Sequence, residues 1–216
     1  MRGATPTAPE VALVVFAKAP QPGRVKTRLA PILGEGGAAH LHTRLVEETL
    51  RLAAKGRFNR VELHCAPRMR DPFFAALALR HRIALRAQGA GDLGARMRRA
   101  FERVLRAADA AVLIGTDCPV MRPADLRAAA SALREGADAV FCPAEDGGYA
   151  LIGLRRVSSR LFAGIEWGSA TVMPDTRARL RSLGWRWREL RTLWDVDRPE
   201  DYARLRRSGL LRRIAA

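Results

Sequence analysis

Four cations in one loop are the first residues of this sequence whose types could do chemistry. The loop spans residues 16–29, is rich in Pro and Gly, and carries Lys18, Arg24, Lys26 and Arg28. Backbone N–H groups and ammonium ions in such a loop can surround a polyphosphate. It is not a Walker A loop, because its Lys-Thr pair follows a valine instead of a glycine. Two of the chain's three lysines lie here, so a phosphate site is favoured over a basic surface loop.

A lone carboxylate, Asp117, comes shortly after the apolar run Ala111–Ile114. Mg²⁺ is commonly held by one or two carboxylates together with substrate phosphates, so one aspartate at this place is chemically adequate. The alternative is an aspartate that only caps the next turn, because Asp often accepts hydrogen bonds from the backbone that follows it. The residues alone support these two interpretations equally.

A third cluster combines the turn Asp146–Tyr149 with Asp195 and Asp197. The glycines of the turn would let a ligand approach the backbone closely, and its tyrosine could stack or form a hydrogen bond. Asp195 and Asp197 are two residues apart at an expected strand end, so they would project to the same side. Each feature could instead be a hairpin turn or a helix cap.

Other polar residues give weaker signals. The loop Gly91–Met97 opens an expected helix, whose N-terminus could receive a base or a phosphate. The four histidines show no metal-binding spacing, and the three cysteines form no C-x-x-C pair. Neither a zinc site nor a disulfide framework is therefore indicated.

Alternating short β-branched runs and longer amphipathic stretches must position these clusters. Such alternation is typical of an α/β fold with a mainly parallel sheet flanked by helices. The expected strands are Val11–Phe16, Val61–Ala66, Ile83–Gln88, Ala111–Ile114, Ala139–Pro143, Tyr149–Leu154 and Trp185–Leu193. The expected helices are Gly36–Lys55, Pro72–Leu79, Leu93–Ala107, Pro123–Glu135, Ser169–Leu183 and Arg198–Arg207. Ligands of open α/β sheets bind beyond the carboxyl ends of the strands, where the polar clusters lie.

Length and composition indicate one packed domain. The 216 residues fit a single core, so we expect one domain over residues 10–216 behind a flexible tail over residues 1–9. The net charge of +16 suggests an anionic partner. Almost all of the basic charge is arginine, however, dispersed along helical stretches without a recognition motif, which argues against nucleic acid as the main partner. The start lacks the apolar core of a signal peptide, and its longest apolar run is too short to span a bilayer, so a cytoplasmic protein is expected.

Five segments, taken together and in order, resemble a bacterial family within the nucleotide-diphospho-sugar transferase superfamily. They read F-A-K-A-P-Q-P-G-R-V-K-T-R-L, G-D-L-G-A-R-M, I-G-T-D-C-P, A-E-D-G-G-Y-A-L-I-G-L and D-V-D-R-P-E-D-Y. The resemblance implies a Rossmann-like, three-layer α/β/α sandwich of glycosyltransferase-A type that binds a nucleotide. It also implies that Asp117 and Asp197 hold Mg²⁺ or Mn²⁺, and that Lys18, Lys26 and Arg28 hold phosphates.

The resemblance does not determine which bond of the nucleotide donor is broken. The metal motif is Thr-Asp-Cys around Asp117 instead of the usual Asp-x-Asp, and the first loop is also similar to that of 2-phospholactate guanylyltransferases. A nucleotide-sugar glycosyltransferase acting on a small-molecule acceptor is the leading hypothesis. A nucleotidyltransferase that joins a nucleoside triphosphate to a phosphorylated acceptor and releases pyrophosphate is the alternative, and a non-catalytic nucleotide- or nucleic-acid-binding module is a third. The oligomeric state stays open, with a homodimer among the alternatives.

The candidate residues fall into four roles. Catalytic roles are expected for Lys26, Asp117 and Asp146, and metal binding for Asp117 and Asp197. Nucleotide and phosphate binding are expected for Ala17, Lys18, Gly23, Lys26, Thr27, Arg28, Gly91, Asp92 and Arg96. Acceptor binding is expected for Asp146, Gly147, Gly148 and Tyr149.

Overall fold

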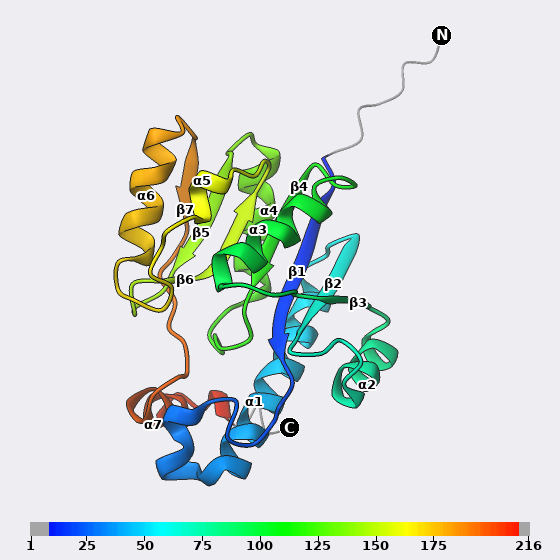
Figure 1. The fold of residues 1–216 in the computed structure, drawn as a ribbon, viewed down its shortest axis with the longest axis vertical. Helices are drawn as coiled ribbons and strands as arrows, with labels where there is room; N and C mark the ends of the chain where they lie inside the picture. The colour runs from blue at the N-terminus through cyan, green and yellow to red at the C-terminus, as the bar shows by residue number, and fades with distance from the viewer. Residues whose placement is uncertain (1–8, 212–216) are drawn as a thin grey trace.

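One mixed sheet organises the chain. The structure is a computed structural model that describes residues 9–211, so nearly all of the expected tail over residues 1–9 lies outside the described residues. Seven strands form the sheet in the order β3-β2-β1-β4-β6-β5-β7 (Figure 1). They are β1 (Val11–Lys18), β2 (Arg60–Ala66), β3 (Ala84–Ala87), β4 (Ala110–Ile114), β5 (Ala139–Pro143), β6 (Tyr149–Leu154) and β7 (Trp187–Glu189). Only β6 runs antiparallel to its neighbours, so the sheet is mainly parallel as the sequence predicts.

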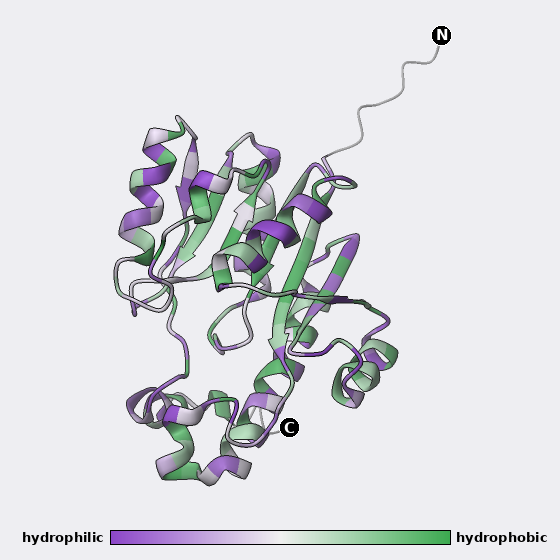
Figure 2. Ribbon diagram, viewed as in Figure 1, coloured by the Kyte–Doolittle hydropathy of each residue, from purple (hydrophilic) through white to green (hydrophobic). Residues whose placement is uncertain are grey.

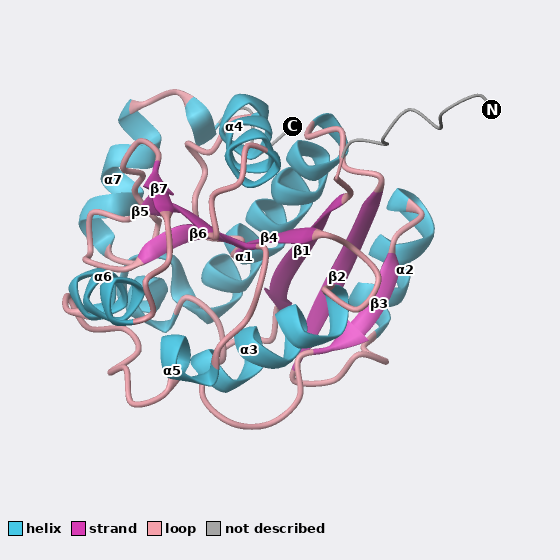
Figure 3. Cartoon of the chain, turned by 90° about the horizontal axis from the view of Figure 1, so that it is seen from above, coloured by secondary structure: helices cyan, strands magenta, loops and turns pink. Residues whose placement is uncertain are grey.

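Helices cover both faces of this sheet, which gives the expected three layers (Figure 3). They are α1 (Ala30–Lys55), α2 (Pro72–His81), α3 (Leu93–Val104), α4 (Pro123–Arg134), α5 (Ser159–Phe162), α6 (Val172–Ser182) and α7 (Pro199–Arg207), and a short 3-10 helix, η1 (Thr27–Leu29), precedes α1. One core lies between the sheet and helices α1, α2 and α4. A second core lies between the sheet and helices α3, α5 and α6. Figure 2 shows the result, with apolar strands inside and hydrophilic bands on the outer helices.

The alternation of side chains along β1 explains why this strand is the centre of the molecule. Leu13 and Val15 pack into one core, while Ala12 and Val14 pack into the other. The strand is paired on both sides, with β2 and with β4. A strand that is buried on both faces and along both edges must be apolar throughout, and this is the pattern of its sequence.

The ends of several elements differ from the expected ones. The predicted strand Trp185–Leu193 shortens to β7, because it pairs only with Ala139–Phe141 of β5. Farther along, Leu193 forms one isolated bridge to Ala144. The helix expected from Gly36 begins at Ala30 instead, and Gly34 with a φ of 68° separates its first turn from the rest.

A small third core fixes the segment after β7. Trp194, Val196 and Leu205 pack there with Leu29 and with the first half of α1. This packing brings the loop after β1 and the segment that leads into α7 to the same end of the sheet. No helix within residues 9–211 is long and apolar enough to cross a membrane.

Candidate active site

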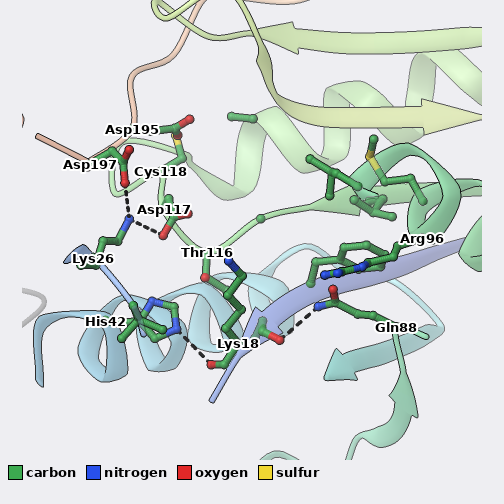
Figure 4. Close-up of a pocket in the computed structure, with 18 of the residues that line it drawn as sticks. Lys18, Lys26, His42, Gln88, Arg96, Thr116, Asp117, Cys118, Asp195 and Asp197 are labelled. Atoms are coloured by element: carbon green, nitrogen blue, oxygen red, sulfur yellow. Dashed lines mark hydrogen bonds and ion pairs between the residues drawn. The ribbon is translucent and has the colours of Figure 1, made fainter. Parts of the chain in front are cut away.

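A cavity of about 610 Å³ opens at the carboxyl ends of β1 and β4 (Figure 4). Its wall is formed by the loops after β1 and β4, the residue after β3, the start of α3, parts of α1 and β6, and the segment after β7. Polar lining residues are Lys18, Arg24, Lys26, Thr27, Arg28, His42, Gln88, Arg96, Thr116, Asp117, Tyr149, Asp195 and Asp197. Residues from each predicted cluster therefore meet at one site, although they lie up to about 180 residues apart in the sequence.

Lys26 is the residue that joins the parts of this wall. Its backbone is left-handed, with φ 49° and ψ 37°, and its side chain is only 3% exposed. The Nζ atom lies 2.5 Å from Asp117 Oδ1 and 3.9 Å from Asp197 Oδ1. It also donates a hydrogen bond of 2.6 Å to the carbonyl oxygen of Val196. One buried ammonium thus ties the loop after β1 to the end of β4 and to the segment after β7.

Asp117 presents its two carboxylate oxygens differently. Oδ1 is buried against Lys26, whereas the side chain as a whole is 48% exposed and lines the cavity. Burial is the largest single influence and acts to raise the pKa of Asp117, but the combined effects of Lys26, His42 and Lys18 outweigh it and hold the pKa below its ordinary value. The carboxylate is therefore ionised at neutral pH and can offer an oxygen to a ligand.

Two further carboxylates border the same end of the cavity. Asp197 Oδ2 accepts a hydrogen bond of 2.6 Å from Arg28. Burial raises the pKa of Asp195 to about 7, with smaller contributions from the negative charges of Asp117 and Asp146. Asp195 was not among the expected site residues, although its spacing of two from Asp197 in the sequence was the available signal.

These carboxylate oxygens suit a hard divalent cation that is also bound by substrate phosphates. Within residues 9–211, no three His, Cys, Asp or Glu side chains are arranged to hold a metal ion by themselves. Mg²⁺, however, needs only one or two carboxylates when substrate phosphates complete its shell. Asp117 and Asp197 fit that arrangement, because both line the cavity and are linked through Lys26.

The cations of the loop after β1 divide into paired and unpaired ones. Lys26 and Arg28 are both engaged with aspartates. Lys18 and Arg24 also line the cavity, and neither side chain forms an ion pair within the described part of the chain. Lys18 and Arg24 are therefore the cations of this loop that are free to meet an anion, and Arg24 was absent from the predicted set.

The remaining residues expected in this loop have different positions. Ala17 and Thr27 line the cavity with the cations. Gly23 does not, and it provides a turn with φ 69° instead.

The far end of the cavity is less charged and contains a residue that the sequence analysis missed. Gln88 lies just after β3 and is buried. Its Nε2 donates hydrogen bonds to the carbonyl oxygens of Ala17, at 3.1 Å, and His64, at 2.9 Å. Because both amide hydrogens are used, its Oε1 is left as the group that can accept a hydrogen bond from a ligand. Phe16 lines the same end and offers an apolar face.

The glycine loop before α3 contributes through its arginine only. Arg96 lines the cavity, whereas Gly91 and Asp92 do not. Asp92 caps α3 by accepting a hydrogen bond of 2.7 Å from the backbone N–H of Ala95. The cap engages one of the donors that were expected to receive a phosphate.

The turn Asp146–Gly148 lies beside the cavity and is not part of its wall. Asp146 Oδ1 accepts a hydrogen bond of 2.9 Å from the backbone N–H of Gly148. Gly147 has a φ of 91° and packs directly against the backbone of Ala170. Of the four residues expected to bind an acceptor, Tyr149 alone lines the cavity.

Comparison with known proteins identifies the relatives of the chain. The model of a family described as an uncharacterised protein conserved in bacteria (DUF2064) matches residues 49–169. No curated protein matches the sequence. A candidate nucleotide-diphospho-sugar transferase from Desulfovibrio desulfuricans G20 is 32% identical over 93% of this chain and 88% of its own, with a TM-score of 0.84.

Two more distant solved structures share the fold. A nucleotidyl transferase from Methanothermobacter thermautotrophicus is 16% identical and has a TM-score of 0.56, covering 94% of this chain and 98% of its own. Glucosyl-3-phosphoglycerate synthase from Mycobacterium tuberculosis, solved with Mn²⁺, uridine diphosphate and glucosyl-3-phosphoglycerate, is 12% identical. Its TM-score is 0.54, over 94% of this chain and 77% of its own. The fold predicted from the sequence is confirmed as that of the nucleotide-diphospho-sugar transferases.

Proposed function

Because the chain belongs to the bacterial DUF2064 family and has the nucleotide-diphospho-sugar transferase fold, we propose that it transfers a group from a nucleotide-activated donor. The observation that carries this proposal is the set of charged side chains that line the cavity. The unpaired cations Lys18 and Arg24 face the same space as the carboxylates of Asp117 and Asp197. Cations beside carboxylates suit a ligand that is both a phosphate chain and a partner of a divalent metal.

Each part of the cavity has a role in this proposal. Lys18 and Arg24 bind the phosphates, and Gln88 accepts a hydrogen bond from the nucleobase. Asp117 and Asp197 would hold Mg²⁺ or Mn²⁺. When bound, that ion would neutralise negative charge on the phosphate leaving group.

Sugar transfer to a small-molecule acceptor is the first form of this proposal. It is supported by the relative from Desulfovibrio desulfuricans, whose description names a nucleotide-diphospho-sugar transferase and which covers nearly the whole chain. The acceptor would enter beside Tyr149, which lines the cavity next to the donor site. Asp146 would contact the acceptor from the neighbouring turn, while Gly147 and Gly148 shape that turn.

Nucleotidyl transfer is the second form, and the first loop favours it. Besides the two cations that are paired with aspartates, this loop places Lys18 and Arg24 at the cavity, and their charge suits the greater negative charge of a triphosphate. A triphosphate donor would use that charge, and pyrophosphate would be the leaving group. This form is supported by the nucleotidyl transferase from Methanothermobacter, which shares the fold.

A mass-spectrometric turnover screen distinguishes the two forms. The purified protein is incubated with Mg²⁺ or Mn²⁺, a panel of nucleotide-sugars and nucleoside triphosphates, and a pool of small acceptors. Nucleoside diphosphate released from a sugar donor would establish sugar transfer, and pyrophosphate released from a triphosphate would establish nucleotidyl transfer.

Matched variants test where the activity resides. Asp117→Asn should lower turnover by a factor of about 100 or more, because the metal loses its charged ligand. Glu135→Gln makes the same chemical change at the exposed C-terminal end of α4 and should leave turnover unchanged. Turnover that survives in Asp117→Asn would contradict the proposed site.

A further inference from the structure

The two lysines of the cavity differ in whether their ammonium groups are paired with acidic side chains. Lys18 is exposed at the end of β1, and its ammonium has no ion pair among the described residues. Lys26 is buried, and its ammonium is surrounded by oxygens of Asp117, Val196 and Asp197 (Figure 4). Lys18 therefore faces the space for a ligand, whereas Lys26 is directed into the protein.

The surroundings of Lys26 leave little capacity for a phosphate. Its ammonium donates a hydrogen bond of 2.6 Å to the carbonyl oxygen of Val196 and forms an ion pair of 2.5 Å with Asp117 Oδ1. Asp197 Oδ1 lies 3.9 Å from the same nitrogen. Only 3% of the side chain is exposed, so a phosphate could reach Nζ only after displacing a carboxylate.

The position of Lys26 also bears on metal binding. Its positive charge stands between the two carboxylates that the proposed function assigns to the divalent cation. Like charges repel, so the ammonium opposes a metal ion at Asp117 even while it holds that side chain in place. Through Val196 it also holds the segment that carries Asp195 and Asp197.

We propose that Lys26 is a positioning residue that fixes the metal-binding aspartates and competes with the metal ion, while Lys18 contacts the phosphates of the donor. This inference rests on the proposed function, since it concerns the same cavity. It departs from the expectation that Lys26 itself holds a phosphate. It also predicts that the protein binds a divalent metal weakly until a phosphate ligand adds its own oxygens.

Two probes that need no knowledge of the substrate test the proposal. The first is Mn²⁺ alone, followed by electron paramagnetic resonance of the free ion. The second is inorganic tripolyphosphate without metal, followed by titration calorimetry. Lys26→Met should bind Mn²⁺ about tenfold more tightly than the wild type, because a positive charge beside the metal site is removed. Lys18→Met should change Mn²⁺ binding less, because its ammonium does not pair with Asp117.

Tripolyphosphate binding separates a direct phosphate ligand from a positioning residue. Lys18→Met should weaken it about fivefold or more, through loss of a charge-assisted contact. Lys26→Met should also weaken it, but for another reason: the Asp117 carboxylate is left without its counter-ion and repels the anion. The double variant Lys26→Met with Asp117→Asn should therefore recover binding close to that of the wild type. Adding Asp117→Asn to Lys18→Met should not restore binding to the wild-type level.

Thermal denaturation shows whether each variant is folded. If Lys26→Met does not fold, Lys26→Gln replaces it, because the amide keeps a donor for the Val196 carbonyl and removes the charge. Tripolyphosphate binding that stays weak in the double variant would make Lys26 a direct phosphate ligand and overturn the inference. Unchanged Mn²⁺ affinity in a folded Lys26 variant would also overturn it. A wild-type protein that binds neither probe would contradict the proposed function, and this inference with it.

Discussion

Glu62 is a single residue whose chemistry affects the stability of the whole sheet. It lies on β2, is 1% exposed, and is paired with Arg60 at 2.7 Å and with Arg103 of α3 at 2.9 Å. His64 Nε2 lies 3.0 Å from Glu62 Oε2, the same oxygen that Arg103 contacts. The hydrogen bond from His64 is the largest cause that holds the pKa of Glu62 at about 2, and the two arginines add to it against the effect of burial.

This low pKa predicts how the stability depends on pH. The folded state binds a proton at Glu62 less readily than the unfolded state, whose pKa is near 4.5. The stabilising contribution is therefore complete well above pH 4.5 and is lost as the pH falls toward 2. By pH 3 the free energy of unfolding should have lost about 2 kcal/mol from this residue.

Urea denaturation of the wild type and of Glu62→Gln at pH 7 and pH 3 measures this loss. The amide does not titrate, so the variant should be less stable at pH 7 but should lose about 2 kcal/mol less on acidification. Glu135→Gln should keep nearly all of the wild-type pH dependence: hydrogen bonds from Ser131 and Arg188 lower the pKa of Glu135, but solvent screens these interactions at a fully exposed position. Equal losses in the wild type and in Glu62→Gln would contradict this account of Glu62.

The turn between β5 and β6 shows how one element positions another. Gly147 accepts a hydrogen bond of 2.8 Å from the backbone N–H of Met173, in the first turn of α6. A Cβ at Gly147 would lie 2.3 Å from the carbonyl oxygen of Ala170. The turn and the start of α6 are therefore in direct backbone contact, and only glycine leaves room for it.

A pair of glycine substitutions measures how much that contact contributes to the free energy of unfolding. Gly147 and Gly168 have nearly the same φ, 91° and 89°, but a Cβ at Gly168 would meet nothing within 4 Å. Gly168→Ala should cost about 1 kcal/mol, from backbone strain alone. Gly147→Ala should cost at least about 2 kcal/mol more, because the backbones must move apart. Chemical denaturation gives both values, and equal costs would show that the contact contributes nothing.

At the scale of the whole molecule, the net charge of +16 invites an interaction with nucleic acid. This net charge already counts the acidic partners in pairs such as Arg177–Glu189, Arg191–Asp125 and Arg204–Glu145, and the excess arginines are dispersed along the chain without a recognition motif. The cations that remain unpaired at the cavity suit a small phosphate ligand. We therefore expect only non-specific attraction to DNA.

Fluorescence anisotropy with a labelled duplex tests this expectation. Binding should be detectable at about 50 mM salt and should fall by about a thousandfold or more by 200 mM, because counterion release drives it. Asp117→Asn should leave this DNA binding essentially unchanged, because the aspartate belongs to the nucleotide cavity. Tight binding that persists at 200 mM salt and prefers one sequence would instead support the nucleic-acid-binding alternative.

Local patterns in the sequence were enough to predict most of the helices and strands and some of the residues that line the candidate site. The apolar run of β1, the alternation of strands and helices, and the cations of the first loop are all visible within short windows. Hydrophobic periodicity is a local property, so the fold class and the end of the sheet that carries the site could be predicted. The short β7 was not foreseen, because the length of a strand depends on its partner.

Only the tertiary structure decided which charged side chains of the site are paired with one another. Lys26 and Val196 are 170 positions apart, and no local pattern shows that one donates a hydrogen bond to the other. Gln88 reaches the cavity only because β3 lies two strands away from β1 in the same sheet. The sequence by itself determined which charged residues stand at the carboxyl end of the sheet. The structure decided which of them are neutralised by one another and which stay free for a ligand, since that depends on distances across the sheet order.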